Sequence, residues 1–549
     1  MSTPILLMKT RCVCVCVCVC VCVCLCENNV CVKITHAHTH TNTHAHTQGT
    51  FESSVRISAA DVVADMCETF GVEGWRAALS AVMEHLEEAG RLRSSGTETW
   101  WRRREASIYA VSVMCADCDV ANVASIFQPG DFMQNVVLQD MAHSSPPVLR
   151  GRALQCVACF AEYIPTELAQ QCFAIAVQSL GHDSSLPVQM TAARAIESLS
   201  SSESKTGGGG DGGGGGPKVG AEFMRPHVPM LLQRISVLLS SASEDSALIT
   251  LEALHNTLKT PFATTEEIAA QIPHVIEQIL LALGRSAGDV MIATEAVEAL
   301  EAIVTKNDGE FVGLVANQCA PLCLSLMATP DRFVGTQVES IMELLAKIVK
   351  RPPGAASMVD NPLVSSVLPA LVTTMLTCEL EDILQPGCAC LRSYMREAFR
   401  ETMSMEIQSK PMLECYVHIA VRMLRLGSEG SAAAATAIVA QLFLRCRAEV
   451  ERFLPQLLVT SLVRLRVARG QGLRQAIVGL FARLILQDRA ATILFLRQHS
   501  LSDPHQSALS LLLFVWSRYQ PEFCDGYHVN VTVAALGALL CSGDEELLR

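Results

Sequence analysis

The sequence has few charged and few aromatic residues. Asp, Glu, Lys and Arg make up 18% of its 549 residues, aromatic residues make up 5%, and apolar residues make up 50%. Disordered chains show the opposite balance, with much charge and little apolar sequence, so most of this chain is expected to fold. Glycine and proline are not frequent enough for a collagen-like or wholly low-complexity chain.

Positive charge is also scarce, because 42 Lys and Arg residues face 55 Asp and Glu residues, for a formal net charge of −13. An acidic surface repels phosphate unless basic residues gather in a patch, and we expect no such patch and no direct contact with nucleic acid. The longest uncharged run beyond residue 50, residues 311–330, is interrupted by Asn317, Gln318 and Pro321. We therefore expect no helix inserted in a membrane.

Residues 1–50 form a low-complexity segment. Residues 12–26 alternate cysteine with valine, and residues 35–47 alternate histidine with threonine or alanine. In-frame dinucleotide repeats encode such patterns, so we expect this segment to be disordered or artefactual and exclude it from the fold. Two alternatives stay open: Lys9 and Arg11 precede an apolar run as in a secretory signal, and the Cys and His tracts imitate metal ligands without the spacing of a defined site.

The other 15 of the 24 cysteines lie scattered in apolar stretches, which is typical of reduced thiols rather than of a disulfide framework. Two CxxC pairs occur, Cys115 with Cys118 and Cys156 with Cys159, but 37 residues separate them. Zinc sites commonly have about 15 to 20 residues between such pairs, so we interpret the cysteines as packing residues. We expect no metal site and no cofactor.

From Ser54 onward, apolar residues recur every three or four positions, which predicts consecutive amphipathic helices. Ser145 is placed to cap a helix that begins near Pro146, and Thr264 with Glu267 suggests a capping box. Pro273 and Pro369 are predicted inside helices, which they should bend. The later helices are predicted in these pairs: 266–283 with 289–305, 311–327 with 333–350, 363–378 with 383–402, 412–426 with 431–446, 449–468 with 471–486, and 504–518 with 528–541.

The pairs recur every 40 to 45 residues or so, the period of HEAT and armadillo repeats. One pair is too small to bury its own apolar face, so neighbouring pairs must stack. We therefore predict an all-α fold, a HEAT-repeat α-solenoid in which antiparallel helix pairs form a right-handed superhelix. Residues 51–206 and 221–549 are expected to hold repeats of the same solenoid, and residues 207–220 are expected to be a glycine-rich flexible loop.

Catalytic motifs such as HExxH and GxSxG are missing from the sequence, and we expect neither an enzyme nor catalytic residues. Acidic clusters are more informative, because carboxylates on the inner wall of a solenoid would attract a basic partner. The alternative is that they are ordinary solvated helix faces. The candidate contact residues are Glu295, Glu298, Glu301, Glu379, Glu381 and Asp382.

Several strings along the chain resemble the importin-beta (karyopherin-beta) family. They are residues 54–61 (SVRISAAD), 95–101 (SGTETWW), 104–106 (REA), 151–154 (GRAL), 194–196 (RAI), 387–394 (GCACLRSY) and the block 494–540. The resemblance covers nearly all of residues 51–549, and the Trp100-Trp101 block is its most distinctive part. The chain looks like an internal fragment of such a protein.

The resemblance implies a nuclear import receptor that shuttles between cytoplasm and nucleus. Such receptors enclose basic cargo such as histones and ribosomal proteins, bind phenylalanine-glycine (FG) nucleoporins and respond to the GTPase Ran in its GTP form. They contribute no catalytic residues. The alternative hypothesis is a HEAT-repeat scaffold that holds other proteins together and has no role in transport.

Overall fold

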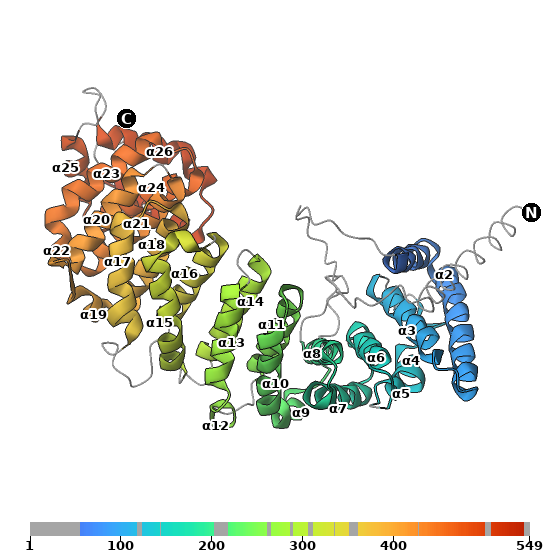
Figure 1. Ribbon diagram of the computed structural model, residues 1–549. Helices are drawn as coiled ribbons and strands as arrows, with labels where there is room; N and C mark the ends of the chain where they lie inside the picture. Colours follow the sequence, from blue (N-terminus) through green and yellow to red (C-terminus); the bar gives the residue numbers. More distant parts are fainter. Residues whose placement is uncertain are drawn as a thin grey trace, which may run out of the picture. The chain divides into compact units, whose positions relative to one another are not determined.

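A computed structural model gives the fold of the chain. It describes residues 55–117, 123–142, 144–201, 218–260, 265–285, 289–305, 311–333, 335–350, 361–426, 428–499 and 507–542. The chain divides into two compact units, Met1–Ala282 and Leu283–Arg549, and each is treated by itself. Nearly all described residues are helical (Figure 1). The low-complexity segment, residues 207–217 of the glycine-rich loop, Cys118 and Thr264 lie outside the described residues.

The first unit is built from helices that follow one another with short connections. Their bounds are α2 Val55–Ser94, α3 Trp100–Asp117, α4 Pro129–Phe132, the π-helical turn η2 Met133–Val137, α5 Leu138–Asp140, α6 Pro147–Phe160, α7 Thr166–His182, α8 Leu186–Ser200, α9 Ala221–Met224, η3 Arg225–His227, α10 Val228–Ser241, α11 Glu244–Lys259, α12 Thr265–Ile268 and α13 Ile272–Arg285, the last of which reaches the boundary. Gly71 breaks α2 with a φ of 51°, a left-handed conformation that favours glycine.

The second unit is also built mainly from consecutive helices. Its elements are α14 Val290–Thr305, α15 Val312–Ala328, η5 Pro330–Arg332, α16 Gly335–Val349, the π-helical turn η7 Leu363–Val367, α17 Leu368–Thr377, α18 Glu381–Glu397, α19 Phe399–Met403, β1 Glu406–Ile407, β2 Lys410–Pro411, α20 Met412–Arg425, α21 Glu429–Arg445, α22 Arg447–Val450, η8 Glu451–Phe453, α23 Leu454–Val467, α24 Gln471–Gln487, α25 Arg489–Gln498, α26 Ala508–Tyr519, η9 Gln520–Glu522 and α27 Gly526–Leu540. The two strands form a small antiparallel hairpin.

Within each unit the helices form two layers. The second helix of each pair packs on the second helix of the next: α3, α6, α8 and α11 follow one another in the first unit, and α14, α16, α18, α21, α24 and α27 in the second. The core lies between these layers, where α6, for example, buries Leu149, Ala153, Cys156 and Phe160 completely. The predicted all-α architecture of stacked helix pairs is confirmed.

Several predicted helix ends are wrong, and proline explains most of the differences. Pro273 is the second residue of α13, where no amide is needed, because the predicted helix 266–283 is broken between Ile268 and Ile272. Pro369 is likewise the second residue of α17, which continues from the π-helical turn η7. The prolines that do lie inside helices are Pro321 in α15 and Pro386 in α18.

The predicted cap of α6 is also wrong. Pro146 occupies the N-cap position, and the Ser145 side chain makes no capping hydrogen bond. The Ser145 carbonyl instead accepts a hydrogen bond from Arg150. Among the described residues, none of the helices has both the length and the apolar character needed to cross a bilayer.

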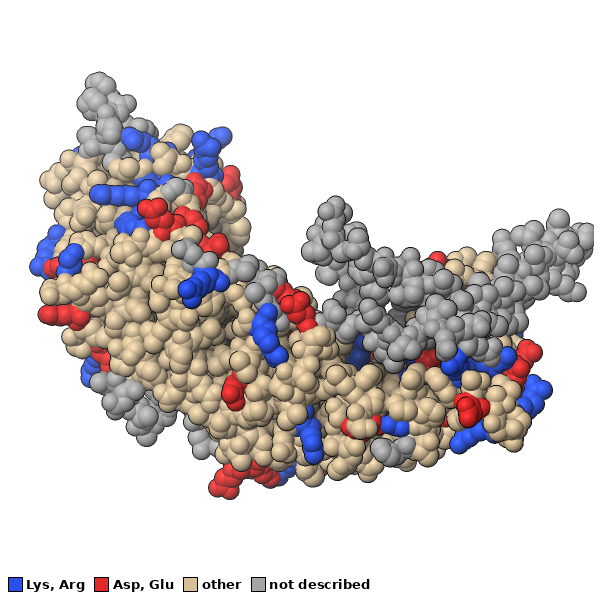
Figure 2. Space-filling view, in the orientation of Figure 1, with Lys and Arg blue, Asp and Glu red and all other residues tan. Residues whose placement is uncertain are grey.

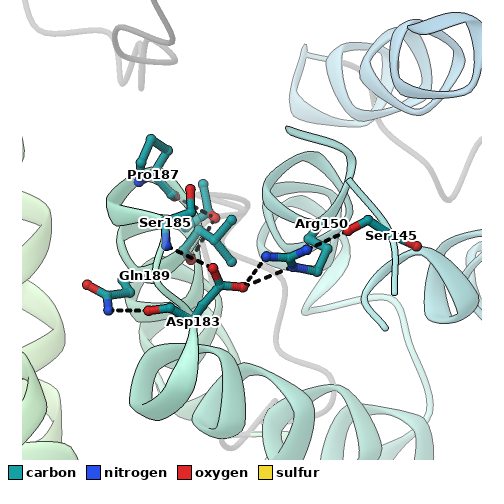
Figure 3. Close-up of polar contacts among 8 residues, drawn as sticks. Ser145, Arg150, Asp183, Ser185, Pro187 and Gln189 are labelled. Atoms are coloured by element: carbon teal, nitrogen blue, oxygen red, sulfur yellow. Dashed lines mark hydrogen bonds and ion pairs between the residues drawn. The ribbon is translucent and has the colours of Figure 1, made fainter. Parts of the chain in front are cut away.

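Buried ion pairs connect consecutive repeats of the first unit. Arg150 on α6 donates from Nε to Asp183 Oδ2 over 2.9 Å, and both side chains are buried (Figure 3). Asp183 follows α7, and its other carboxylate oxygen accepts from the Ser185 amide at the start of α8. Gln189 donates to the Asp183 carbonyl. Arg150 therefore ties α6 to the turn of the next pair.

We expect Arg150→Met to destabilise the first unit by about 3 to 5 kcal/mol, because the substitution leaves the Asp183 carboxylate buried without its counter-charge. The matched control is Arg76→Met, since Arg76 pairs with Glu73 on the exposed surface of α2. This control should cost less than about 1 kcal/mol. Urea unfolding followed by circular dichroism measures both, and equal losses for the two variants would refute the role given to the buried pair.

Candidate functional site

The candidate site lies on the second helices of the second unit. These helices pack against one another more extensively than the first helices α15, α17, α20, α23 and α26 do. The second helices therefore form one continuous layer of this unit. The candidate contact residues were expected on an inner wall of the solenoid, and we call this layer the inner side.

Three of the predicted contact residues, Glu295, Glu298 and Glu301, lie at successive three-residue steps on α14. The intervening positions, which include Ala296 and Leu300, are buried in the core. The helix thus separates an apolar face from a face that carries three carboxylates and no basic residue. The role of these glutamates in contacting a partner stays a prediction.

One of these carboxylates is partly neutralised by a neighbouring helix. Glu301 Oε2 lies 2.8 Å from Lys347 Nζ on α16, and Lys347 also pairs with Glu343 at 3.2 Å. Burial lowers the pKa of Lys347, but its hydrogen bonds to the two glutamates outweigh that effect and raise the pKa. Lys347 therefore stays charged and reduces the negative potential at this end of α14.

The remaining predicted residues, Glu379, Glu381 and Asp382, gather at the start of α18. Glu381 and Asp382 occupy the first turn, where carboxylates favourably oppose the helix dipole. Glu381 also accepts a hydrogen bond from the Ser431 hydroxyl in the first turn of α21. The side chain of Glu381 thus has a structural role, although Glu379, Glu381 and Asp382 are all exposed.

A groove of about 580 Å³ runs between α16, α18 and α21 beside this cluster. It is lined by Gly335, Glu339, Glu381, Asp382, Gln385, Pro386, Cys388, Ala389, Arg392, Ser428, Ala434 and Ala437. The lining has three carboxylates and a single guanidinium, and the two alanines of α21 leave room for a long side chain. We name these twelve residues the acidic groove.

Pro386 lies inside α18 and lines the acidic groove. It has no amide hydrogen and so cannot donate the usual helical bond to the Asp382 carbonyl. Sequence reasoning missed Glu339, because its closeness to Asp382 depends on the packing of α16 against α18.

The acidic character does not continue along the inner side. Helix α24 carries Arg474 and Arg483 and no acidic residue. Residues 445–519 contain eleven arginines, no lysine and four acidic residues, a formal net charge of +7. Lys and Arg side chains lie together with Asp and Glu side chains over the end of the second unit that holds α23 to α26 (Figure 2). The total charge of −13 therefore conceals a local excess of positive charge in this part of the sequence.

The cysteines behave as packing residues where the structure describes them. Cys115 and Cys156 are buried, and Cys159 is half-buried. Burial raises the pKa of the Cys156 thiol far above its usual range, so this sulfur stays protonated. A protonated, enclosed thiol is a poor metal ligand, which favours the packing interpretation.

The sequence is similar to known proteins along most of its length. No protein-family model matches the sequence. Importin-9 of Drosophila melanogaster is 21% identical over 499 residues, and importin subunit beta-5 of Schizosaccharomyces pombe is 23% identical over 466 residues. These alignments cover 89% and 83% of this chain. The chain is therefore similar to importins of the importin-beta family.

The fold comparison agrees with this similarity. The exportin Cse1 in its cargo-free, cytoplasmic state superposes with a TM-score of 0.65 at 12% identity, over 90% of this chain and 50% of Cse1. At that identity the likeness concerns the fold, the stacked helix pairs of the importin-beta family. The chain spans about half the length of the curated relatives it matches, 46% of importin-9 and 43% of importin subunit beta-5.

Beyond the acidic groove, Glu429 in the first turn of α21 gives a pH-dependent prediction. Its carboxylate accepts hydrogen bonds from the amides of Arg469 and Gly470, 2.6 Å each, at the start of α24. These bonds lower the pKa of Glu429 despite partial burial. The ionised Glu429 carboxylate therefore stabilises the folded state fully at pH values above its unfolded-state pKa of about 4.3. This stabilisation is lost as the pH falls through the lower pKa of the folded state.

We expect Glu429→Gln to lower the urea midpoint of the second unit at pH 7. The difference from the unsubstituted chain should shrink below about pH 4 as Glu429 becomes protonated. Glu449→Gln, which changes an exposed glutamate on α22, should show no such dependence. Urea titrations between neutral and acidic pH measure this effect, and a difference that is the same at every pH would exclude the proposed cause.

Proposed function

We propose that the chain is part of a nuclear transport receptor that binds basic protein cargo on the inner side of its second unit. The observation that carries the proposal is the acidic groove, where Glu339, Glu381 and Asp382 lie between consecutive second helices. Family similarity supports the transport role, since the relatives are importins. Histones and ribosomal proteins are the proposed cargo class.

Electrostatics explains why such a groove would select basic segments. The carboxylates of α14, α16 and α18 lie along one layer, so their potentials add over distances near a Debye length of about 8 Å. A lysine or arginine side chain that reaches Ala434 and Ala437 would lie near the carboxylates that line the groove. This electrostatic complementarity would mainly speed association and set specificity. It would contribute less to the affinity itself.

Ran in its GTP form and FG nucleoporins are proposed as further partners of the protein, on family resemblance. The receptor would use them for release of cargo and for passage through pores, respectively. The proposed localisation, shuttling between cytoplasm and nucleus, follows from that role. No chemical step is assigned to any residue, because the function is non-covalent binding.

The acidic groove can be tested with a purified core histone dimer. We expect the double variant Glu339→Gln, Asp382→Asn to bind the dimer at least ~10-fold more weakly at low salt, because two carboxylates of the groove are removed. Affinity of the unsubstituted chain should fall as salt is added. Fluorescence anisotropy with labelled dimer measures both effects.

The control is Glu449→Gln, Glu451→Gln, which removes the same charge from exposed positions on α22 and η8. Equal losses for both double variants would show attraction by total charge and would exclude a groove. A second measurement distinguishes a transport receptor from a scaffold without a transport role. It is the entry of the labelled chain into the nuclei of permeabilised cells. A scaffold would stay outside, whereas a receptor segment that engages pores would enter.

A further inference from the structure

Six arginines of the second unit lie at one end of three consecutive helix pairs, the end where the first helix turns into the second. The set consists of Arg425 in the last turn of α20, Arg464 and Arg466 in the last turn of α23, Arg469 in the following turn, Arg474 near the start of α24, and Arg518 in the last turn of α26. We name these six residues the arginine rim. Helices α20, α23 and α26 pack in sequence, so these ends lie on one side of the layer.

Two contacts fix the position of the Arg474 guanidinium. Its carbon lies 3.8 Å from the centroid of the Tyr519 ring, and its Nε donates to the Ala468 carbonyl over 3.2 Å. A guanidinium stacked on an aromatic ring keeps its other N–H groups available at the edge and loses little entropy when it binds an anion. Arg425, Arg466, Arg469 and Arg518 are exposed.

Acidic residues at the same end offset only part of this charge. Arg464 and Arg474 interact electrostatically with the Glu429 carboxylate. Glu429, Glu522 and Asp525 together oppose six arginines, which leaves an excess of positive charge. The Glu429 carboxylate is occupied by the amides of Arg469 and Gly470, and the Asp525 carboxylate accepts from the Tyr527 amide and lies 2.7 Å from His528 Nδ1. Both carboxylates therefore act as caps of helix starts within the fold.

We propose that the arginine rim is a docking surface for an acidic protein segment, a run of Asp and Glu side chains. The structure already shows the chemistry, because the turn at its centre binds the carboxylate of Glu429 through two backbone amides. Arginine forms two-point hydrogen bonds with carboxylates, and all six cations of the rim are arginines. The rim and the acidic groove have opposite sign and so take different partners.

A polynucleotide fits the rim less well than an acidic peptide. The Tyr519 ring is already stacked against Arg474, which leaves less aromatic surface on which a base could stack. The chain as a whole carries a formal charge of −13, which repels a long polyanion that extends beyond the rim. A short acidic segment avoids most of that repulsion.

The test uses the full chain and a fluorescein-labelled oligoglutamate of about twelve residues, with anisotropy measured at low and raised salt. We expect binding that weakens with salt and a Kd at least ~10-fold higher for Arg466→Glu, Arg469→Glu. The matched control is Arg396→Glu, Arg400→Glu, which reverses the same charge at exposed positions near the other end of α18 and in α19. This control should change the Kd by less than about threefold, since it lies away from the rim.

Three results would overturn the proposal. One is equal weakening by the rim and control variants, which would mean attraction by net charge. Another is tighter binding of a single-stranded oligonucleotide of equal length, which would assign the rim to nucleic acid. The third is unchanged binding by the Arg466→Glu, Arg469→Glu variant with an unchanged melting temperature. The variant Arg466→Lys, Arg469→Lys keeps the charge and should keep most of the binding. It is the control for a loss of binding that comes from misfolding and not from the reversed charge.

Discussion

The constraint on which the structure depends is that no helix pair can bury its apolar face alone. Each second helix covers the next, as α6 covers α8 and α18 covers α21. Core positions are filled by small and medium side chains such as Ala296 and Leu300, which allow close packing of consecutive helices. What remains for solvent is one stripe on each second helix, and the charges on those stripes decide which partner the surface takes.

Polar contacts between repeats then fix how neighbouring pairs meet. Arg150 binds Asp183 in the first unit, and Glu429 caps the start of α24 in the second. Glu381 plays a similar part when it accepts from Ser431. A carboxylate in the first turn of a helix can thus hold two repeats together and still contribute to the surface potential. An acidic residue in this fold is therefore not necessarily a residue that binds a partner.

Helical periodicity predicted most elements, because the apolar stripe of each helix is visible in the sequence. Helix α20 begins at Met412 as predicted. The errors came from local backbone chemistry: Pro273 was read as a kink although it occupies a helix start, and Pro386 was overlooked inside α18. Periodicity cannot distinguish these cases, since both prolines sit within apolar patterns.

The site was only partly predictable for a different reason. Glu381 and Asp382 were visible as a cluster in sequence, whereas Glu339 joins them only through packing of α16 on α18. The pairing of Lys347 with Glu301 similarly joins residues of two helices. The arginine rim was missed because the acidic total obscured a basic region, which an average over the whole chain cannot reveal.

The central claim is that the inner side of the second unit is divided into an acidic part that binds basic cargo and a part that does not. Hydrogen exchange of the chain with and without a core histone dimer tests this claim most directly. The account predicts added protection in α14, α16 and the first half of α18, and little change in α23 and α24. Protection centred on α23 and α24, or spread evenly over all second helices, would contradict it.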